Sequence, residues 1–304
     1  MRVLVLGGDD DEHAVHVLTA LRDRGVRAEM VDSRMFPQQL RITWDPVTDT
    51  GHLVLPGAGR IDFHDIHSVY WRCYNGFTEA LLDDPEQAEL AANDARSLFE
   101  SVLVSLPCRW VNGWEAYQLH QTKPAALARV AAMDLGGVLR CPATCLGNDP
   151  EAVRDFVASR ERCIFKPVQG GAHTRMVRPA HLTDENLRSL AASPVTIQEY
   201  APGADIRVFV AEKRVLACEI LTDATDFRDD PHAEITPVML PDAVADGCLA
   251  IARELHLLWT GIDLRRTDDG TYVFLEANPS PMFIGFEDRA GLALTDALLE
   301  VLTA

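Results

Sequence analysis

Hydrophobic and polar positions follow two different periods along the chain, and the N-terminal region shows both. Residues 3–6 form a short apolar run, and apolar positions within residues 14–21 then recur at helix spacing until Gly25. Residues 26–31 are expected to form a second strand. A strand, a helix and a strand in about 30 residues are typical of a βαβ unit, so this segment predicts a parallel sheet.

The remaining pattern predicts a mixture of short strands and helices. Residues 40–63 are divided by Pro, Asp and Gly into short apolar pieces, which is typical of small hairpins. Strands are expected at 68–72, 107–113, 163–167, 195–200, 205–210, 215–221, 259–264 and 272–277, and helices at 86–106, 122–133, 150–159, 242–256 and 294–302. We expect the three strands within 195–221 to form an antiparallel sheet, and Asp269-Gly270 to turn a hairpin.

Composition and charge exclude several classes of protein. The 304 residues favour two or three packed units, and 47% hydrophobic with 24% charged residues is ordinary for a globular chain. A net charge of −18 repels phosphate backbones and anionic lipid, so neither a nucleic-acid nor a membrane partner is expected. The chain shows no long uncharged apolar stretch and no signal-peptide core. Seven cysteines without a CxxC pair favour reduced thiols and a cytoplasmic protein.

Three oxygen-bearing side chains near the C-terminus are candidates for a metal site. Glu276 and Asn278 are two residues apart in a predicted strand, so they share one face, and the preceding hairpin strand brings Asp263 beside them. Carboxylates together with substrate phosphates suit Mg²⁺. The alternative is that these residues lie on a solvated sheet face.

Two segments upstream have the chemistry of a nucleotide site. Lys166 lies in an apolar strand, where an ammonium group is costly unless it meets an anion, and Gly170-Gly171 follow it. In residues 196–208 a strand ends at Glu199, turns through Pro-Gly and continues with Asp205 and Arg207 on one face. The alternatives are a lysine that reaches solvent from an edge strand and a polar surface turn.

Taken in order, these pieces resemble the ATP-grasp superfamily. The resemblance rests on Lys123, the strand at 165–167 with its glycine loop, the segment 198–205, Asp263 and the segment 276–278. Within the superfamily the chain is similar to the branch that holds graspetide (microviridin-type) peptide cyclases and the glutamate-adding ligases that modify a ribosomal protein. That further similarity rests on residues 8–14, 69–72, 110–112 and 226–228.

The resemblance implies an α/β protein with an ATP-grasp fold. It implies an N-terminal pre-ATP-grasp α/β domain at 1–112, a central α+β lobe at 113–195 and a C-terminal α+β lobe with the metal site at 196–304, the two lobes clamping ATP. It also implies a homodimer.

The resemblance assigns a role to each candidate residue, with ATP and Mg²⁺ as the bound groups. It implies that the phosphates are bound by Lys123 and Lys166 and covered by a loop that contains Gln169, Gly170 and Gly171. It implies that the adenine edge is held by Glu199, Tyr200 and Ala201, and that the ribose is bound by Asp205. It implies that Mg²⁺ is held by Asp263, Glu276 and Asn278, and that the transferring phosphate and the acyl intermediate are contacted by Arg207 and Arg228.

The implied reaction is ADP-forming ligation of a carboxylate to an amine or hydroxyl through an acyl phosphate. The substrate is a ribosomal peptide in natural-product biosynthesis, or a free amino acid that gives a dipeptide or γ-glutamyl product. Both stay open because residues 71–74 read Trp-Arg-Cys-Tyr, where the graspetide cyclases have a second Arg. An alternative of another class is a catalytically inactive, nucleotide-binding regulatory protein.

Overall fold

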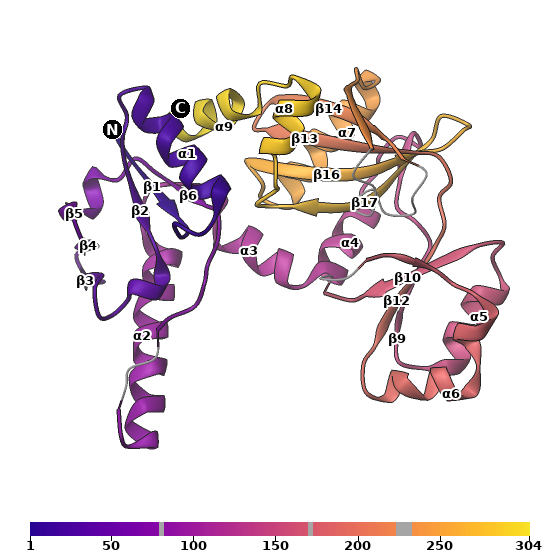
Figure 1. Ribbon diagram of the computed structural model, residues 1–304, viewed down its shortest axis with the longest axis horizontal. Helices are drawn as coiled ribbons and strands as arrows, with labels where there is room; N and C mark the ends of the chain where they lie inside the picture. Colours follow the sequence, from indigo (N-terminus) through magenta and orange to yellow (C-terminus); the bar gives the residue numbers. More distant parts are fainter. Residues whose placement is uncertain (79–81, 170–172, 223–232) are drawn as a thin grey trace.

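The computed structural model describes residues 1–78, 82–169, 173–222 and 233–304. Figure 1 shows a sheet with flanking helices at the N-terminal end, a small sheet at the far end and a larger sheet between them. Helix α9 (Leu294–Thr303) lies next to α1 (Glu12–Asp23), so both chain ends meet at the N-terminal domain. No helix in the described ranges combines the length and the apolar character that crossing a membrane requires.

The N-terminal sheet has the strand order β2-β1-β6-β7, and every neighbouring pair is parallel, as the opening pattern predicts. Successive residues of β1 point to opposite faces: Val3 and Val5 pack with α1 and α9, whereas Leu4 and Leu6 pack with the last turns of α2. The strands are β1 (Arg2–Leu6), β2 (Arg27–Val31), β6 (Ser68–Trp71) and β7 (Arg109–Val111), and α2 spans Pro85–Ser105.

The predicted hairpins at 40–63 are confirmed as an antiparallel sheet that covers the α2 side of this domain. It consists of β3 (Arg41–Asp45), β4 (Thr50–Leu55) and β5 (Gly59–Asp62), between the short 3-10 turns η1 (Ser33–Met35) and η2 (Phe63–Asp65).

The central sheet has the order β11-β10-β12-β9. Its strands are β9 (Thr144–Gly147), β10 (Cys163–Pro167), β11 (Arg175–Met176) and β12 (Val195–Glu199). On one side it packs on α5 (Pro150–Ala158), α6 (Asp184–Leu187) and the 3-10 turns η3 (Pro179–Leu182) and η4 (Arg188–Ala191).

The C-terminal sheet has the order β15-β14-β13-β16-β17-β8 and packs on α7 (Asp242–Glu254). The Asp269-Gly270 turn joins β16 and β17 as predicted, and Gly270 has φ +83°. The strands are β8 (Leu139–Arg140), β13 (Ala204–Ala211), β14 (Arg214–Leu221), β15 (Glu234–Pro237), β16 (Trp259–Arg266) and β17 (Tyr272–Asn278).

The expectation of a single antiparallel sheet for residues 195–221 is wrong. β12 pairs with β10 and β9 in the central sheet, whereas β13 and β14 lie in the C-terminal sheet. The chain crosses between the sheets at Pro202-Gly203. Gly203 has φ +133°, and a Cβ there would lie 2.0 Å from the carbonyl oxygen of Arg266, so only glycine fits this crossing.

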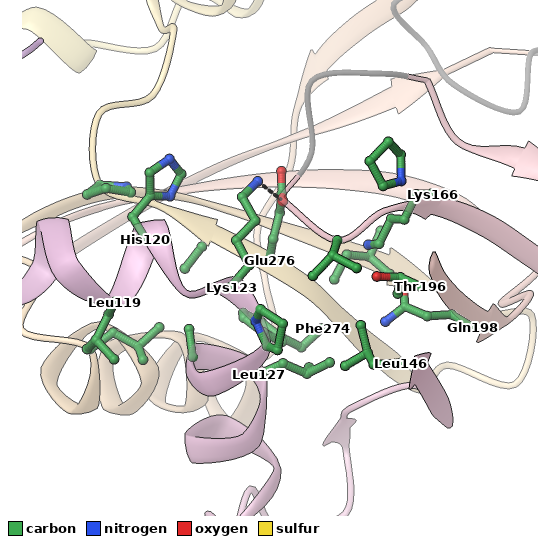
Figure 2. Close-up of a pocket in the computed structure, with 18 of the residues that line it drawn as sticks. Leu119, His120, Lys123, Leu127, Leu146, Lys166, Thr196, Gln198, Phe274 and Glu276 are labelled. Carbon is green, nitrogen blue, oxygen red and sulfur yellow. Dashed lines mark hydrogen bonds and ion pairs between the residues drawn. The ribbon is translucent and has the colours of Figure 1, made fainter. Parts of the chain in front are cut away.

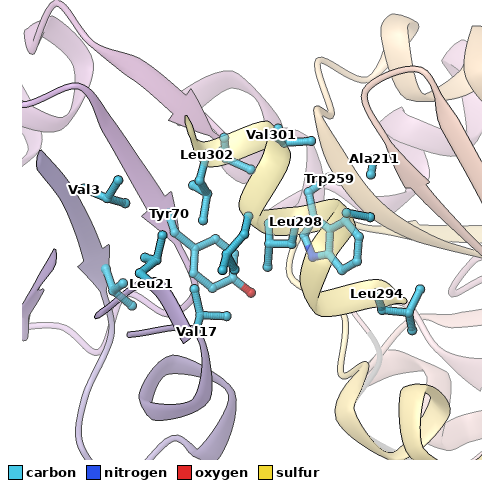
Figure 3. Close-up of a cluster of buried hydrophobic side chains, with 14 of the residues drawn as sticks. Val3, Val17, Leu21, Tyr70, Ala211, Trp259, Leu294, Leu298, Val301 and Leu302 are labelled. Atoms are coloured by element: carbon cyan, nitrogen blue, oxygen red, sulfur yellow. The ribbon is translucent and has the colours of Figure 1, made fainter. Parts of the chain in front are cut away.

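The C-terminal helix completes the core of the N-terminal domain. Figure 3 shows Leu298, Val301 and Leu302 of α9 between Tyr70 on one side and Trp259 on the other. The last residues of the chain therefore join the first domain to the C-terminal sheet. The domain boundaries at 112 and 195 remain a prediction. In the structure, β8 pairs within the C-terminal sheet, and β12 of the central sheet extends to Glu199.

Candidate functional site

A cleft lies between the central and C-terminal sheets and is closed on a third side by two helices. These helices are α3 (Trp114–Gln121), which the sequence pattern did not predict, and α4 (Lys123–Ala131). Figure 2 shows the apolar side chains of Leu127, Leu146 and Phe274 below the charged pair of Lys123 and Glu276. The cleft therefore offers an apolar wall that suits a flat ring and a charged end that suits an anion.

A row of charged side chains crosses the C-terminal sheet on one face. Arg207 of β13 lies opposite Asp263 of β16, and Asp263 lies opposite Glu276 of β17. Residues opposite each other point to the same face, so the predicted neighbourhood of the two carboxylates is present. Arg207 Nη1 donates to Asp263 Oδ1 at 2.6 Å, and Lys123 Nζ donates to Glu276 Oε2 at 2.9 Å.

The two carboxyl groups differ in their proton affinity. Burial raises the pKa of Asp263 above its usual range, although the Arg207 guanidinium opposes the shift. Burial would also raise the pKa of Glu276, but the ammonium groups of Lys123 and Lys166 outweigh it and hold that pKa below its usual range. Glu276 is therefore a carboxylate at neutral pH with cations on two sides.

Asn278 supplies a third oxygen beside this pair. It lies opposite Gly261, two residues along from the Asp263–Glu276 pair, and its Oδ1 accepts from the backbone N–H of Ser280 at 3.0 Å. Two carboxylates and an amide oxygen are hard donors that suit Mg²⁺ when phosphate oxygens complete the shell. Within the described ranges, no three or more His, Cys, Asp or Glu side chains form a metal site by themselves.

Lys166 points into the cleft from the central sheet. Burial lowers the pKa of its ammonium group, and no hydrogen bond or ion pair joins that group to the described residues. An ammonium group in this position is stabilised by an incoming anion.

Gln198 is a cleft residue that the sequence interpretation missed. Lys166 lies opposite Thr196, so β12 turns Thr196 and Gln198 toward the cleft, and both line it. Gln198 is 2% exposed, its Nε2 donates to Thr144 Oγ1 at 3.0 Å, and its Oε1 is buried without a partner. The available signal was the alternation along β12, since Thr196 and Gln198 are two residues apart and therefore point to the same face of the strand. Lys166 of the neighbouring strand β10 lies opposite Thr196 and points to that face as well.

The predicted adenine and ribose residues lie outside the lining of the cleft. The Glu199 carboxylate pairs with Arg140. Arg265 holds the other three: its guanidinium pairs with Asp205 at 2.7 Å and donates to the Ala201 carbonyl at 3.1 Å and to the Tyr200 hydroxyl at 3.4 Å. The structure thus brings Tyr200, Ala201 and Asp205 together, around a cation instead of around the cleft.

The predicted phosphate loop is described only at its start. Gln169 Nε2 donates to Gln121 Oε1 at 3.3 Å, which joins the loop to α3. Gly170, Gly171 and the predicted catalytic Arg228 lie outside the described residues.

A second cavity adjoins the cleft on the side of the N-terminal domain. His120 and Pro279 line both spaces, so the two are neighbours. Its walls include the aromatic rings of Trp71 and Tyr117, stacked at 4.8 Å between centroids, and the side chain of Asn278. His120 was missed together with α3, a short helix with a single fully buried residue.

Fold and site together define a nucleotide-dependent ligase of the ATP-grasp type. Residues 126–302 match the RimK-like ATP-grasp domain, and the chain belongs to this family.

Three known proteins are similar to the chain. The ATP-grasp ligase PsnB, solved with a minimal precursor, is 32% identical with a TM-score of 0.83, covering 99% of this chain and 97% of that one. The macrocyclase MdnC of Microcystis aeruginosa, bound to its precursor peptide MdnA, is 23% identical with a TM-score of 0.84 over 100% of both chains, which shows the fold alone.

Among curated proteins, a probable alpha-L-glutamate ligase of Trichodesmium erythraeum is 33% identical over 108 residues, or 34% of this chain and 36% of that protein. The chain thus spans about a third of that relative's length.

Family membership confirms the ATP-grasp resemblance and the predicted fold. It also confirms the general class, an ATP-grasp ligase that uses ATP and Mg²⁺, and PsnB has been solved with Mg and ADP. The individual site residues stay predictions.

Proposed function

We propose that this protein joins a carboxylate to an amine or hydroxyl through an acyl phosphate, with release of ADP and phosphate. One observation carries the proposal. Lys123, Lys166 and Glu276 line the charged end of an apolar cleft whose buried Gln198 oxygen lacks a donor, and Asp263 lies opposite Glu276 on the next strand. A nucleoside triphosphate has the complementary parts: a flat ring with an exocyclic amine and a chain of phosphates.

Each end of the cleft has its own task in binding ATP. The Gln198 Oε1 accepts from the exocyclic amine of adenine, while Leu127 and Phe274 contact the ring. Lys166 and Lys123 bind the phosphates, since a compact ammonium group suits a phosphate oxygen. Asp263, Glu276 and Asn278 hold Mg²⁺, which supplies positive charge to the phosphoryl oxygens when bound.

The substrate carboxylate enters from the second cavity and attacks the γ-phosphorus. The bond from the γ-phosphorus to the ADP oxygen breaks, and the products are an acyl phosphate and ADP. An amine or hydroxyl then attacks the acyl carbon, the carbon–oxygen bond breaks toward phosphate, and the nucleophile loses its proton. Arg207 lies two strands from Glu276, with Asp263 between them, and its guanidinium balances the charge on the transferred group.

A ribosomal peptide is the substrate we favour. PsnB, 32% identical over nearly the whole chain, was solved with a precursor, and the second cavity, with the rings of Trp71 and Tyr117 in its wall, adjoins the cleft. The second candidate is a free amino acid, which the relatives named alpha-L-glutamate ligase favour. Homodimer formation, a cytoplasmic setting and the absence of nucleic-acid and membrane partners stay predictions from the sequence.

Product analysis tests the proposal. The protein is incubated with ATP and Mg²⁺ and with either pooled amino acids or a precursor peptide encoded beside its gene. We expect ADP and phosphate, together with a product lighter by one water per new bond. Release of AMP and pyrophosphate would reject the acyl-phosphate route. Nucleotide binding without turnover on any substrate would favour the regulatory alternative.

A further inference from the structure

The segment that follows β17 is gripped by a residue of the N-terminal domain. Arg72, directly after β6, donates from Nη1 to the Ser280 carbonyl oxygen at 2.7 Å and to Ser280 Oγ at 3.0 Å. The Ser280 hydroxyl donates in return to the Arg72 carbonyl oxygen at 2.6 Å. Three hydrogen bonds thus join two residues that are 208 positions apart in the chain.

The guanidinium that makes this grip is itself fixed. Arg72 Nε donates to both carboxylate oxygens of Asp11 at 3.0 Å, and Asp11 also accepts from the Ala14 N–H at the start of α1 at 2.8 Å. The Arg72 side chain is only 11% exposed. A charged, largely buried group with these partners has one orientation, so it transmits its position to Ser280.

Ser280 in turn selects the atom that Asn278 presents. Its N–H donates to Asn278 Oδ1, and an amide oxygen has a second lone pair left for a cation. Asn112, directly after β7, holds the same segment, because its Nδ2 donates to the Pro279 carbonyl at 2.6 Å while its Oδ1 accepts from the Leu258 and Trp259 N–H groups. Both grips come from the N-terminal domain.

We propose that Arg72 is a positioning residue that acts through Ser280 to aim the Asn278 oxygen at the divalent cation. The N-terminal domain thereby sets the cation affinity of a site carried by the C-terminal sheet. This inference rests on the proposed function, in which Asn278 is a cation ligand. Residues that orient a metal ligand typically change metal affinity 10- to 100-fold when they are replaced.

Mn²⁺ binding in the presence of ADP tests this relay without a known substrate. Electron paramagnetic resonance measures free Mn²⁺ for the wild type, Arg72→Met and Arg109→Met. Arg109 is a matched control at the same domain junction, since it donates to the Val301 carbonyl at 2.8 Å and pairs with Glu212 at 2.9 Å, away from Asn278. Metal-free ADP affinity is measured by calorimetry for all three.

We expect Arg72→Met to raise the Mn²⁺ dissociation constant about tenfold, with metal-free ADP affinity unchanged and Arg109→Met within about twofold of wild type. Equal Mn²⁺ affinity in Arg72→Met and wild type, or an equal loss in Arg109→Met, overturns the relay. If Arg72→Met fails to fold by circular dichroism, Arg72→Lys and Ser280→Ala replace it under the same criterion. A wild type that binds ADP but no Mn²⁺ rejects the proposed metal site itself.

Discussion

The two walls of the cleft differ in how completely their polar groups are satisfied. On the C-terminal sheet, the carboxylates of Asp263 and Glu276 each have a cation and Asn278 accepts from Ser280, although Arg207 Nε is buried without a partner. On the central sheet, Gln198 Oε1 is buried without a partner, and Lys166 has no hydrogen bond or ion pair among the described residues. One wall is organised before a ligand arrives, while the other has polar groups that a ligand would satisfy.

This difference separates two physical roles. A preorganised set of charges needs little reorganisation when charge develops in the transition state, so it contributes mainly to the rate of the reaction. An unsatisfied buried group costs the free protein stability and returns that free energy when a ligand pairs with it. Changes on the C-terminal wall should therefore lower turnover, and changes on the central wall should shift nucleotide affinity and stability.

The largest effect is expected from Glu276→Gln. The substitution keeps the shape of the side chain but removes the charge that faces Lys123 and the bound cation, so ADP formation should fall about 10³-fold. The Glu276 side chain is 40% exposed, which leaves room for water around Lys123, so folding should survive. ADP release with substrate and a thermal melt measure the two quantities.

Glu219→Gln serves as the matched control for this substitution. Glu219 is also a carboxylate on a strand of this sheet with a cationic partner, in its case Arg266 at 2.6 Å. Wild-type turnover in Glu276→Gln, or an equal loss in Glu219→Gln, would show that the organised wall does not act through this carboxylate.

Gly261→Ala tests how closely that wall is packed. A Cβ at Gly261 would lie 2.4 Å from Arg207 Nη2 and 2.8 Å from Pro281 Cβ, so the Arg207 guanidinium must leave Asp263. We expect a loss of about 1–3 kcal/mol in stability and a fall in turnover of about 100-fold. Gly285→Ala, with no atom within 4 Å of the new Cβ, should retain activity. Unchanged turnover in Gly261→Ala would contradict the slot for Arg207.

Sequence patterns predicted the elements that depend on local order. The β16–β17 hairpin followed from Asp269-Gly270 and two apolar runs, and the hairpin was enough to predict Asp263 beside Glu276, although not the register that places them opposite each other. The parallel start of the chain followed from its βαβ spacing. Each of these features is determined within about 30 consecutive residues, so a pattern along the sequence is enough to predict it.

Features that depend on contacts between segments far apart in the chain could not be predicted from the same patterns. The division of β12 from β13 depends on Gly203 passing the Arg266 carbonyl, a contact between segments far apart in the chain. The Arg72–Ser280 grip likewise spans two domains. Helix α3 carries one fully buried residue, so its pattern is weak, and His120 was lost with it. No role was predicted for Gln198, because the sequence alone does not show that its amide oxygen is buried without a partner.

On the central wall, Lys166→Met should weaken ATP binding about tenfold or more, because one charge-assisted contact to phosphate is lost. Lys213→Met is the control, since Lys213 lies in the turn between β13 and β14 and the chain has only three lysines. Calorimetry measures both. Equal affinity of Lys166→Met and wild type would remove Lys166 from the nucleotide site.

The same lysine also predicts a pH dependence. Burial lowers the pKa of Lys166, so its positive charge is lost at a lower pH than that of an ordinary lysine. ATP affinity of the wild type should therefore fall as pH rises toward that pKa, whereas Lys166→Arg stays charged and should show a flatter profile.

The smallest and most diagnostic effect is expected from Gln198→Leu. It removes a buried oxygen without a partner, so the free protein should gain about 1 kcal/mol in stability, while Thr144 keeps its bond to the Pro142 carbonyl. ATP affinity should fall severalfold, because the exocyclic amine of adenine loses its acceptor. If the central wall has an unsatisfied polar group, the thermal melt should show a gain in stability while calorimetry shows a loss of ATP affinity. A variant that loses both stability and affinity would mean that Gln198 is a packing residue and that the two walls do not differ in this way.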